Sequence, residues 1–158
     1  FGFDVSAFFQ GTGNHYWYPN AESMAFWGPY SRPYCSFIAD DFLDHVWAED
    51  NPDAYFPRPR GYSAFTDGAY LANVNDRYLQ NIRYLRFKNL TVGYTVPKKA
   101  TRKIGIEKIR VYFSGENLGV IAPGLHSDYM DPEMALVGGK CHIYPWQKTF
   151  MFGVDINF

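Results

Sequence analysis

The chain has 158 residues, enough for one domain, and a formal net charge of −1 at pH 7. This balance lacks the basic excess typical of nucleic-acid-binding proteins, so no nucleic-acid partner is expected. Aromatic residues make up 20% of the chain, above ordinary globular usage, and the mean hydropathy is −0.31. No apolar run reaches the roughly 18 residues of a spanning helix, which excludes a helical membrane protein but not a β-barrel, whose strands turn only alternate residues to lipid.

The sequence begins with Phe1 rather than Met and shows no signal peptide, so we expect it to be a piece of a longer polypeptide. Apolar side chains alternate with polar ones from Phe3 to Phe9. This period of two predicts a strand over residues 1–11, about the length that a tilted strand needs to cross a bilayer.

Residues 12–82 lose this regularity and are rich in Pro, Gly, Asn and aromatic residues. Helical spacing predicts a short helix from Ile38 to Ala48, with Asp40 or Asp41 as its N-cap. A connection this long is uncommon in a compact domain, and its aromatic content argues against disorder. We therefore expect a packed, largely ordered loop.

A second strand is predicted over residues 83–96, but its two halves differ in phase. Leu85 and Phe87 alternate onto the side opposite Leu90, which indicates a β-bulge or the point where the strand leaves a membrane. The turn over residues 97–106 follows. It carries Lys98, Lys99, Arg102 and Lys103, which would contact lipid headgroups or a periplasmic partner, or would simply be solvated.

Strands are also predicted over residues 107–117 and 146–158, with an irregular connection over 118–145 between them. The last strand alternates strictly, although Gly, Asp and Asn on its polar side are poor strand formers. A closed barrel in lipid holds such a strand, because every backbone group there must pair. Long connections that alternate with a short turn are typical of outer-membrane barrels. The alternative is a soluble β-domain, such as a secreted β-sandwich that binds carbohydrate through exposed aromatic rings.

Three segments resemble the C-terminal end of the SusC/RagA-like TonB-dependent transporters of the Bacteroidetes outer membrane. They are Tyr84-Leu85-Arg86-Phe87-Lys88-Asn89-Leu90-Thr91-Val92-Gly93-Tyr94 with Pro97; Ile109-Arg110-Val111-Tyr112 with Ser114-Gly115-Glu116-Asn117-Leu118; and Asp131-Pro132-Glu133, Tyr144-Pro145, Lys148-Thr149 and Phe152-Gly153 running to Phe158. Trp47, Glu49, Asn51-Pro52-Asp53-Ala54 and Tyr55 to Arg58 resemble a stretch of the preceding long loop. Met130 departs from the family, which often has Tyr there.

The resemblance implies an all-β fold in which these are the last four antiparallel strands of a 22-stranded transmembrane barrel, with the plug domain outside this chain. It implies a Gram-negative outer-membrane importer of oligosaccharides or peptides, not an enzyme, that needs no cofactor. The implied partners are a SusD-like surface lipoprotein, the TonB-ExbB-ExbD complex, the outer-membrane lipid and the barrel-assembly machinery, for which Phe158 would be the recognition signal. Loops 12–82 and 118–145 would be extracellular, and the 97–106 turn and the C-terminus periplasmic.

The alternation also divides the strand residues into two predicted faces. Those expected to line the lumen or meet the plug are Asp4, Ser6, Gln10, Thr91, Arg110, Ser114, Glu116, Gln147, Thr149, Asp155 and Asn157. Those expected to face lipid are Phe3, Val5, Leu90, Val92, Ile109, Val111, Phe113, Phe150, Phe152, Val154 and Ile156.

Aromatic residues in the long loop are candidates for contact with a ligand or the lid lipoprotein, because flat rings give a large contact area with few rotors. These candidates are Tyr16, Trp17, Trp27, Trp47 and Tyr55. The alternative is that they form the loop's own small core.

The acidic cluster Asp128, Asp131 and Glu133 has three interpretations: a Ca²⁺ site, a glycosidase acid/base pair in a hydrolase, or turn chemistry. The Asp-Pro step and the spacing favour a turn. The four histidines lack ligand spacing, so no metal site is assigned. Cys35 and Cys141 would be disulfide-bonded or two free thiols.

Overall fold

The computed structural model describes residues 2–21, 23–30, 38, 40–60, 65, 71–127, 130–135 and 146–158. The chain divides into two compact units. The sheet unit contains Phe1–Gly13, Tyr84–Pro123 and Trp146–Phe158, and the loop unit contains Asn14–Arg83 and Gly124–Pro145. None of the helices in the described ranges has the length and apolar character that a bilayer crossing requires.

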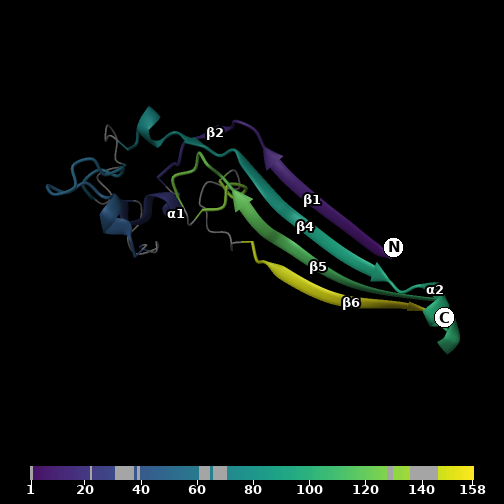
Figure 1. Cartoon of the computed structure of the whole chain (residues 1–158). Helices are drawn as coiled ribbons and strands as arrows, with labels where there is room; N and C mark the ends of the chain where they lie inside the picture. Colours follow the sequence, from purple (N-terminus) through teal and green to yellow (C-terminus); the bar gives the residue numbers. More distant parts are fainter. Residues whose placement is uncertain are drawn as a thin grey trace. The chain divides into compact units, whose positions relative to one another are not determined.

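Four antiparallel strands form the sheet unit, as predicted (Figure 1). They are β1 (Phe3–Thr12), β4 (Tyr84–Thr95), β5 (Lys108–Ile121) and β6 (Thr149–Asn157), in the spatial order β1-β4-β5-β6. β5 is longer than the predicted 107–117. It continues beyond Asn117, whose φ of +52° is the left-handed conformation that Asn tolerates better than most residues.

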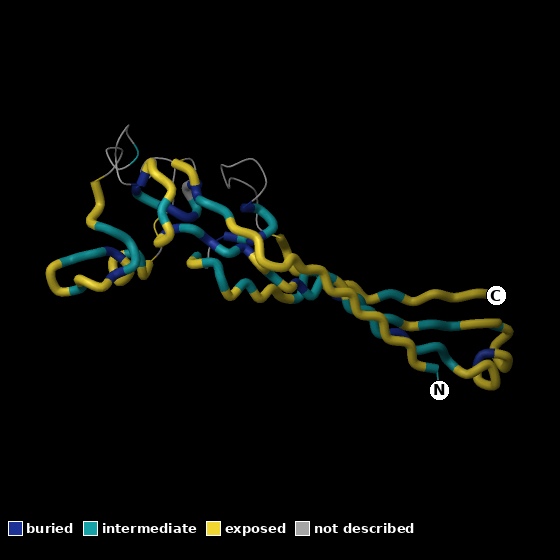
Figure 2. The backbone as a smooth tube through the Cα atoms, turned by 90° about the horizontal axis from the view of Figure 1, so that it is seen from above, coloured by how far each residue is buried: buried dark blue, intermediate teal, exposed yellow. Residues whose placement is uncertain are grey.

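Strand register gives the sheet two chemically different faces. Val5, Val92, Phe113 and Phe152 lie opposite one another in one row, and Ser6, Thr91, Ser114 and Met151 lie in the next. Directly opposed residues of antiparallel strands point to the same side, so apolar and polar rows alternate between the two sides of the sheet. Both faces of β1 and nearly all of β6 are exposed within the described residues, as the colouring in Figure 2 shows.

The phase break predicted in the second strand is confirmed as a shift in register. Phe8 pairs with Asn89, whereas the next residue, Phe9, pairs with Phe87, so Lys88 is the extra residue on β4. The shift returns Phe87 to the side of Phe9, and the two rings stack with centroids 4.6 Å apart. A second shift, in which Glu116 faces Asn89 and Gly119 faces Phe87, lies at the same level on β5.

The connection between β4 and β5 is a compact helical turn made of α2 (Lys98–Thr101) and η5 (Arg102–Ile104). Thr101 is buried, its Oγ1 donates to the Lys98 carbonyl at 3.3 Å, and its own carbonyl accepts from the Ile106 amide at 3.2 Å. Gly105 reverses the chain with φ +73°, a conformation that glycine adopts without steric cost. The turn is therefore fixed by its own hydrogen bonds.

Short elements around an aromatic core make up the loop unit. They are β2 (Tyr16–Trp17) paired with β3 (Gln80–Asn81), α1 (Met24–Trp27), η1 (Gly28–Tyr30), η2 (Phe42–His45) and η4 (Asp76–Tyr78). The buried core residues are Phe26, Trp27, Tyr30, Val46, Leu71, Tyr78, Ile82, Met130 and Ala135. The packed, ordered loop that the composition predicted is thus present in the described residues.

The helix expected from Ile38 to Ala48 is wrong in extent. Only Phe42–His45 is helical among the described residues of that stretch. Val46 is extended and bridges Phe56, which draws the chain into a sheet-like pairing and ends the helix. The Asp41 side chain makes no capping hydrogen bond and lies 3.3 Å from Nε2 of His45 instead.

Candidate functional site

A charged network crosses the polar face of the sheet. Arg110 on β5 donates from Nε to Oδ1 of Asp4 at 3.1 Å and from Nη2 to Oδ2 at 2.6 Å. Its Nη1 donates to Oδ2 of Asp155 on β6 at 3.4 Å. One guanidinium thus links β1, β5 and β6, and the paired contacts to Asp4 have the bidentate geometry that strengthens Arg–carboxylate interactions.

Two glycines leave the space that this network occupies. A Cβ at Gly93 would lie 2.6 Å from both Nη2 of Arg110 and Oδ1 of Asp4. A Cβ at Gly153 would overlap the ring of Tyr112, which pairs with Gly153 across the strands. The Arg110 guanidinium lies 5.1 Å from the centre of the same ring. Arg110, Asp4 and Asp155 were among the site residues predicted from the sequence, whereas Gly93, Gly153 and Tyr112 were not.

The remaining residues predicted to line the lumen follow the same register. Ser6, Thr91 and Ser114 share a row, with the Thr91 and Ser114 hydroxyls 3.3 Å apart, and Glu116 pairs with Thr149. The rest lie nearer the strand ends: Gln10 donates to Tyr84 Oη at 3.3 Å, Asn157 pairs with Lys108, and Gln147 precedes β6 and accepts a hydrogen bond from Asn117 at its backbone carbonyl. Arg86, which pairs with Gln10 and is 3% exposed, was not among the residues predicted for this face.

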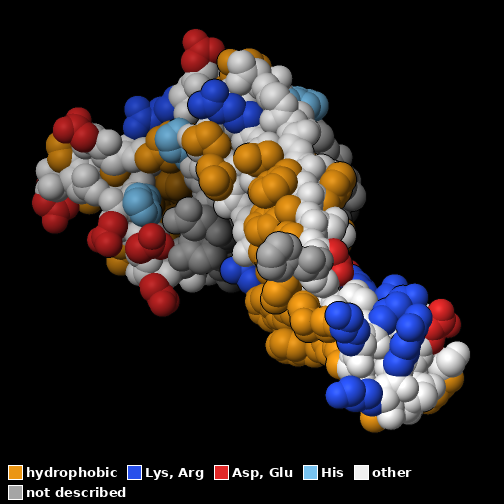
Figure 3. Space-filling view, turned by 45° about the vertical axis from the view of Figure 1, so that its right-hand side comes forward, with side chains coloured by type: hydrophobic (Ala, Val, Ile, Leu, Met, Phe, Trp, Pro, Cys, Tyr) orange, Lys and Arg blue, Asp and Glu red, His pale blue; other side chains and the backbone are white. Residues whose placement is uncertain are grey.

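The opposite face of the sheet is apolar and largely uncovered. Its most exposed side chains are Phe152 at 83%, Phe3 at 69% and Val5 at 68%. Figure 3 shows hydrophobic side chains gathered over the strands and Lys and Arg gathered at one end of the sheet. Large apolar areas of this kind mark contact with a membrane or another protein.

The loop aromatics divide between core and surface. Trp27 is fully buried and its Nε1 donates to the Pro19 carbonyl at 3.0 Å, so its expected contact with a ligand or lid is wrong and the core alternative holds. Trp17 packs partly buried against the core at Phe26. Tyr16, by contrast, is 62% exposed.

Tyr55 is a hydrogen-bonding centre of the loop unit. Its hydroxyl donates to the Arg77 carbonyl at 2.9 Å and accepts from Nε2 of Gln80 at 2.9 Å, and its ring stacks on His126 at 4.8 Å. Gln80 is fully buried and its Oε1 accepts from the His126 amide at 2.9 Å. Burial raises the pKa of the Tyr55 hydroxyl, against the opposing effect of the Gln80 hydrogen bond, and so keeps it a neutral donor.

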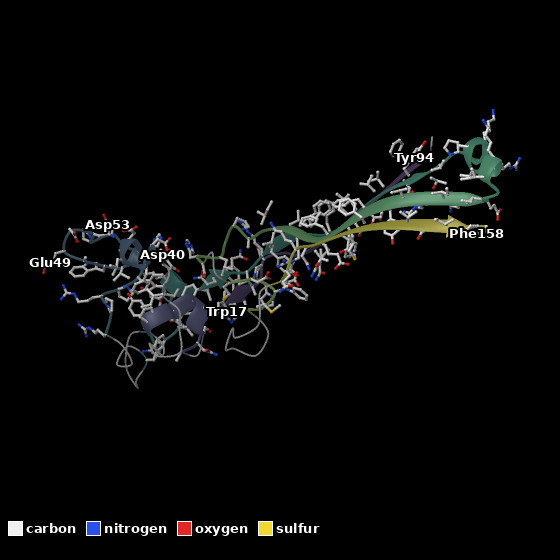
Figure 4. The ribbon with its side chains drawn as sticks, turned by 90° about the horizontal axis from the view of Figure 1, so that it is seen from below. Trp17, Asp40, Glu49, Asp53, Tyr94 and Phe158 are labelled. Atoms are coloured by element: carbon white, nitrogen blue, oxygen red, sulfur yellow. The ribbon has the colours of Figure 1, made fainter. Side chains whose placement is uncertain are left out.

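An open pocket of about 310 Å³ lies beside Trp47, lined also by Pro52, Ala54, Phe56, Pro57, Arg58 and Arg77. The Arg58 guanidinium lies 4.5 Å over the Trp47 ring and 3.9 Å from Glu49. Figure 4 shows Asp40, Glu49 and Asp53 in this part of the loop unit. The pocket beside Trp47 is therefore lined by an aromatic ring and two guanidinium groups, with Glu49 next to Arg58.

The acidic cluster 128–133 is only partly within the described residues. Asp131 accepts the Glu133 amide at its Oδ1 at 3.0 Å, and its carbonyl accepts the Met134 amide at 2.9 Å, which is the turn geometry favoured by the sequence. Asp128, Cys35 and Cys141 lie outside the described residues. The described ranges contain no group of three His, Cys, Asp or Glu residues placed to hold a metal ion.

No family model matches the chain, but it is similar to several known proteins. The chain is 27% identical over 122 residues to TonB-dependent receptor P3 of Formosa agariphila, which covers 72% of this chain and 11% of the receptor. The RagAB peptide transporter superposes with a TM-score of 0.65 at 22% sequence identity, over 99% of this chain and 16% of that one. The RagAB peptide importer in its closed-closed and open-open states gives TM-scores of 0.65 and 0.62, with the same identity and coverage.

The chain thus spans only a small part of each of these relatives. The similarity to the RagAB structures establishes the fold, and the sequence of this chain is similar to that of TonB-dependent receptor P3. Together with the motifs in the strands, they confirm that this chain resembles part of a SusC/RagA-like TonB-dependent transporter.

Proposed function

We propose that this chain forms part of the barrel wall of a TonB-dependent importer in the outer membrane, as the last four strands of a 22-stranded barrel. The observation that carries the proposal is the two-faced antiparallel sheet, whose exposed apolar face backs onto a face of polar and charged side chains. A transmembrane barrel wall needs this arrangement, because lipid lies on one side and a polar interior on the other.

Energetics favour lipid over water for the apolar face. Burial of a Phe side chain is worth roughly 1.5–3 kcal/mol, and the exposed face carries Phe3, Phe150 and Phe152 besides its aliphatic residues. On the other face, charged residues inside a membrane are expected to pair, and Arg110 does so with two carboxylates. Each face therefore suits the surroundings that the proposal assigns to it.

The assembly follows from the same proposal. The turn of α2 and η5 and the C-terminus would lie in the periplasm, the loop unit outside the cell, and Phe158 would be read by the barrel-assembly machinery. TonB-ExbB-ExbD would supply energy, and a SusD-like lipoprotein would cover the extracellular side. The solved neighbours are peptide importers, which supports peptide cargo; the class of cargo here is proposed as peptide or oligosaccharide.

Paired cysteine variants of the full-length protein would test the wall assignment. Phe152→Cys and Val154→Cys lie on the apolar face, and their sequence neighbours Met151→Cys and Asp155→Cys lie on the polar face. A nitroxide attached to the first pair should be broadened by oxygen dissolved in lipid, and one attached to the second pair should not. A soluble protein in which all four labels respond alike would overturn the proposal and favour the secreted β-sandwich.

Import itself is tested in cells that carry the full-length gene and its genomic neighbours. Uptake of labelled peptides or oligosaccharides should stop when the gene is deleted and when the proton gradient is collapsed. Uptake that survives both treatments would contradict a TonB-dependent role.

A further inference from the structure

The turn between β4 and β5 displays four cations on a rigid frame. Lys98, Lys99, Arg102 and Lys103 are all exposed, and none of them makes an ion pair with another described residue. No acidic residue occurs between Pro97 and Ile106. The buried Thr101 holds the frame through its bonds to Lys98 and Ile106, so the cations are presented by ordered backbone.

An apolar side chain lies within this cationic turn. Ile104 is 66% exposed and directly precedes the chain reversal at Gly105. At the same end of the sheet, Ile109 pairs with the exposed Ile156 on the apolar face. An exposed apolar residue that follows several cations in the sequence, at the end of a sheet with an exposed apolar face, is the composition of segments that lie in the membrane interface.

We propose that this turn, defined as residues 97–106, binds the headgroups of anionic phospholipids at the rim of the barrel. Ile104 inserts among the acyl chains, and the four cations contact the lipid phosphates. Two observations select lipid over a free anion: the exposed Ile104 has no role in binding a dissolved ion, and the apolar face places acyl chains beside the turn. The inference rests on the proposed membrane location, because the cations need a bilayer next to them.

The test uses the full-length transporter, purified in neutral detergent and titrated with phosphatidylglycerol or phosphatidylethanolamine while native mass spectrometry counts bound lipids. Lys98→Gln/Lys99→Gln and Arg102→Gln/Lys103→Gln each remove two cations from the turn. The matched control, Arg83→Gln/Lys148→Gln, removes two exposed cations beyond the other ends of the strands. Each cation near an anionic surface contributes roughly a fivefold change in binding, so each turn variant, which lacks two cations, should lose about 25-fold in phosphatidylglycerol affinity.

The expected result is a preference for phosphatidylglycerol that falls in both turn variants and persists in the control. Equal binding by turn variants and wild type would overturn the proposal, as would displacement of phosphatidylglycerol by inorganic phosphate or a stronger preference for lipid A. Failure of the barrel proposal looks different, because the wild-type protein would then stay in solution without detergent. A labelled Ile104→Cys should show the same oxygen broadening as the apolar-face labels, and a fully aqueous label would also refute the insertion.

Discussion

Arg110 on β5 contacts Asp4 on β1, with Nη2 2.6 Å from Oδ2, although β4 lies between the two strands. The contact passes directly above Gly93, where no side chain intervenes. A long arginine, a short aspartate and a glycine thus connect strands that share no backbone hydrogen bonds.

Substitution of Gly93 by alanine should break this contact. The new Cβ would lie 2.6 Å from Nη2 of Arg110 and Oδ1 of Asp4, closer than a Cβ approaches atoms that it is not bonded to, so Arg110 or Asp4 must move away. We expect a lower thermal midpoint for the folded barrel, read from the heat-dependent gel shift. Gly119→Ala is the matched control on β5, because a Cβ there meets nothing within 4 Å, and a Gly93→Ala barrel as stable as this control would contradict the prediction.

Removal of the arginine should leave two carboxylates on the polar face without their shared cation. Arg110→Gln is therefore expected to destabilise the barrel more than Asp155→Asn, which leaves the bidentate pair with Asp4 intact. Chemical denaturation of wild type, Arg110→Gln and Asp155→Asn in detergent measures the difference. Asp4→Asn and the Asp4→Asn/Arg110→Gln double variant complete a cycle, and a double variant that loses as much stability as Asp4→Asn and Arg110→Gln added together would show that the two residues are not coupled.

Tyr112 and Gly153 should behave as a coupled pair. Gly153→Ala forces the Tyr112 ring out of its position and should cost about 1–3 kcal/mol, the usual range for overpacking. In a Tyr112→Ser background the same glycine substitution should cost much less, because the ring is gone. Denaturation of the four proteins of this cycle gives the coupling, and equal costs in both backgrounds would refute it.

Trp27 should be essential to the loop unit and dispensable to the sheet. Trp27→Ala removes a fully buried ring and is expected to cost about 3–5 kcal/mol of local stability. Hydrogen exchange should then accelerate in the loop unit while β5 and β6 keep their protection. Tyr16→Ala, which removes a 62% exposed ring, is the control and should leave exchange nearly unchanged.

The loop unit should weaken in alkali because of Tyr55. Burial raises the pKa of its hydroxyl above its usual value of 10.0, so the folded state holds the proton more tightly than the unfolded chain. This contribution to stability is complete below pH 10.0 and is lost as the pH rises through the folded-state pKa. Proteolytic cleavage of the loop unit followed against pH measures the effect, and a Tyr55→Phe variant with an equally steep alkaline response would assign it to another group.

Periodicity was sufficient to predict the sheet but not the contacts across it. Alternation assigned Asp4, Arg110 and Asp155 to one face, because side-chain direction depends only on parity along each strand. Their convergence depends on the register between strands. A long loop separates β1 from β4 in the sequence, so the sequence does not show which residues of the two strands lie opposite one another. For this reason Gly93 could not be recognised as the gap that lets Arg110 reach β1.

The loop unit was less predictable for a different reason. Aromatic rings serve equally in a core and on a binding surface, so the sequence alone did not separate Trp27 from Tyr16. Burial in the structure separates them, since it depends on contacts among segments far apart in the chain. The helix around Phe42 was predicted too long. Val46 bridges Phe56, and this contact cannot be read from the spacing of nearby residues.

The register shifts at Lys88 and after Glu116 affect how the sheet tolerates insertion or deletion of residues in its strands. At their level the count of residues differs from strand to strand, yet Phe9 and Phe87 still meet on one side. Gain or loss of one residue there can be absorbed by the local irregularity. The same change near Val111 would move every following side chain of the strand to the opposite face of the sheet. Natural insertions and deletions within the strands should therefore occur mainly at the level of these two register shifts.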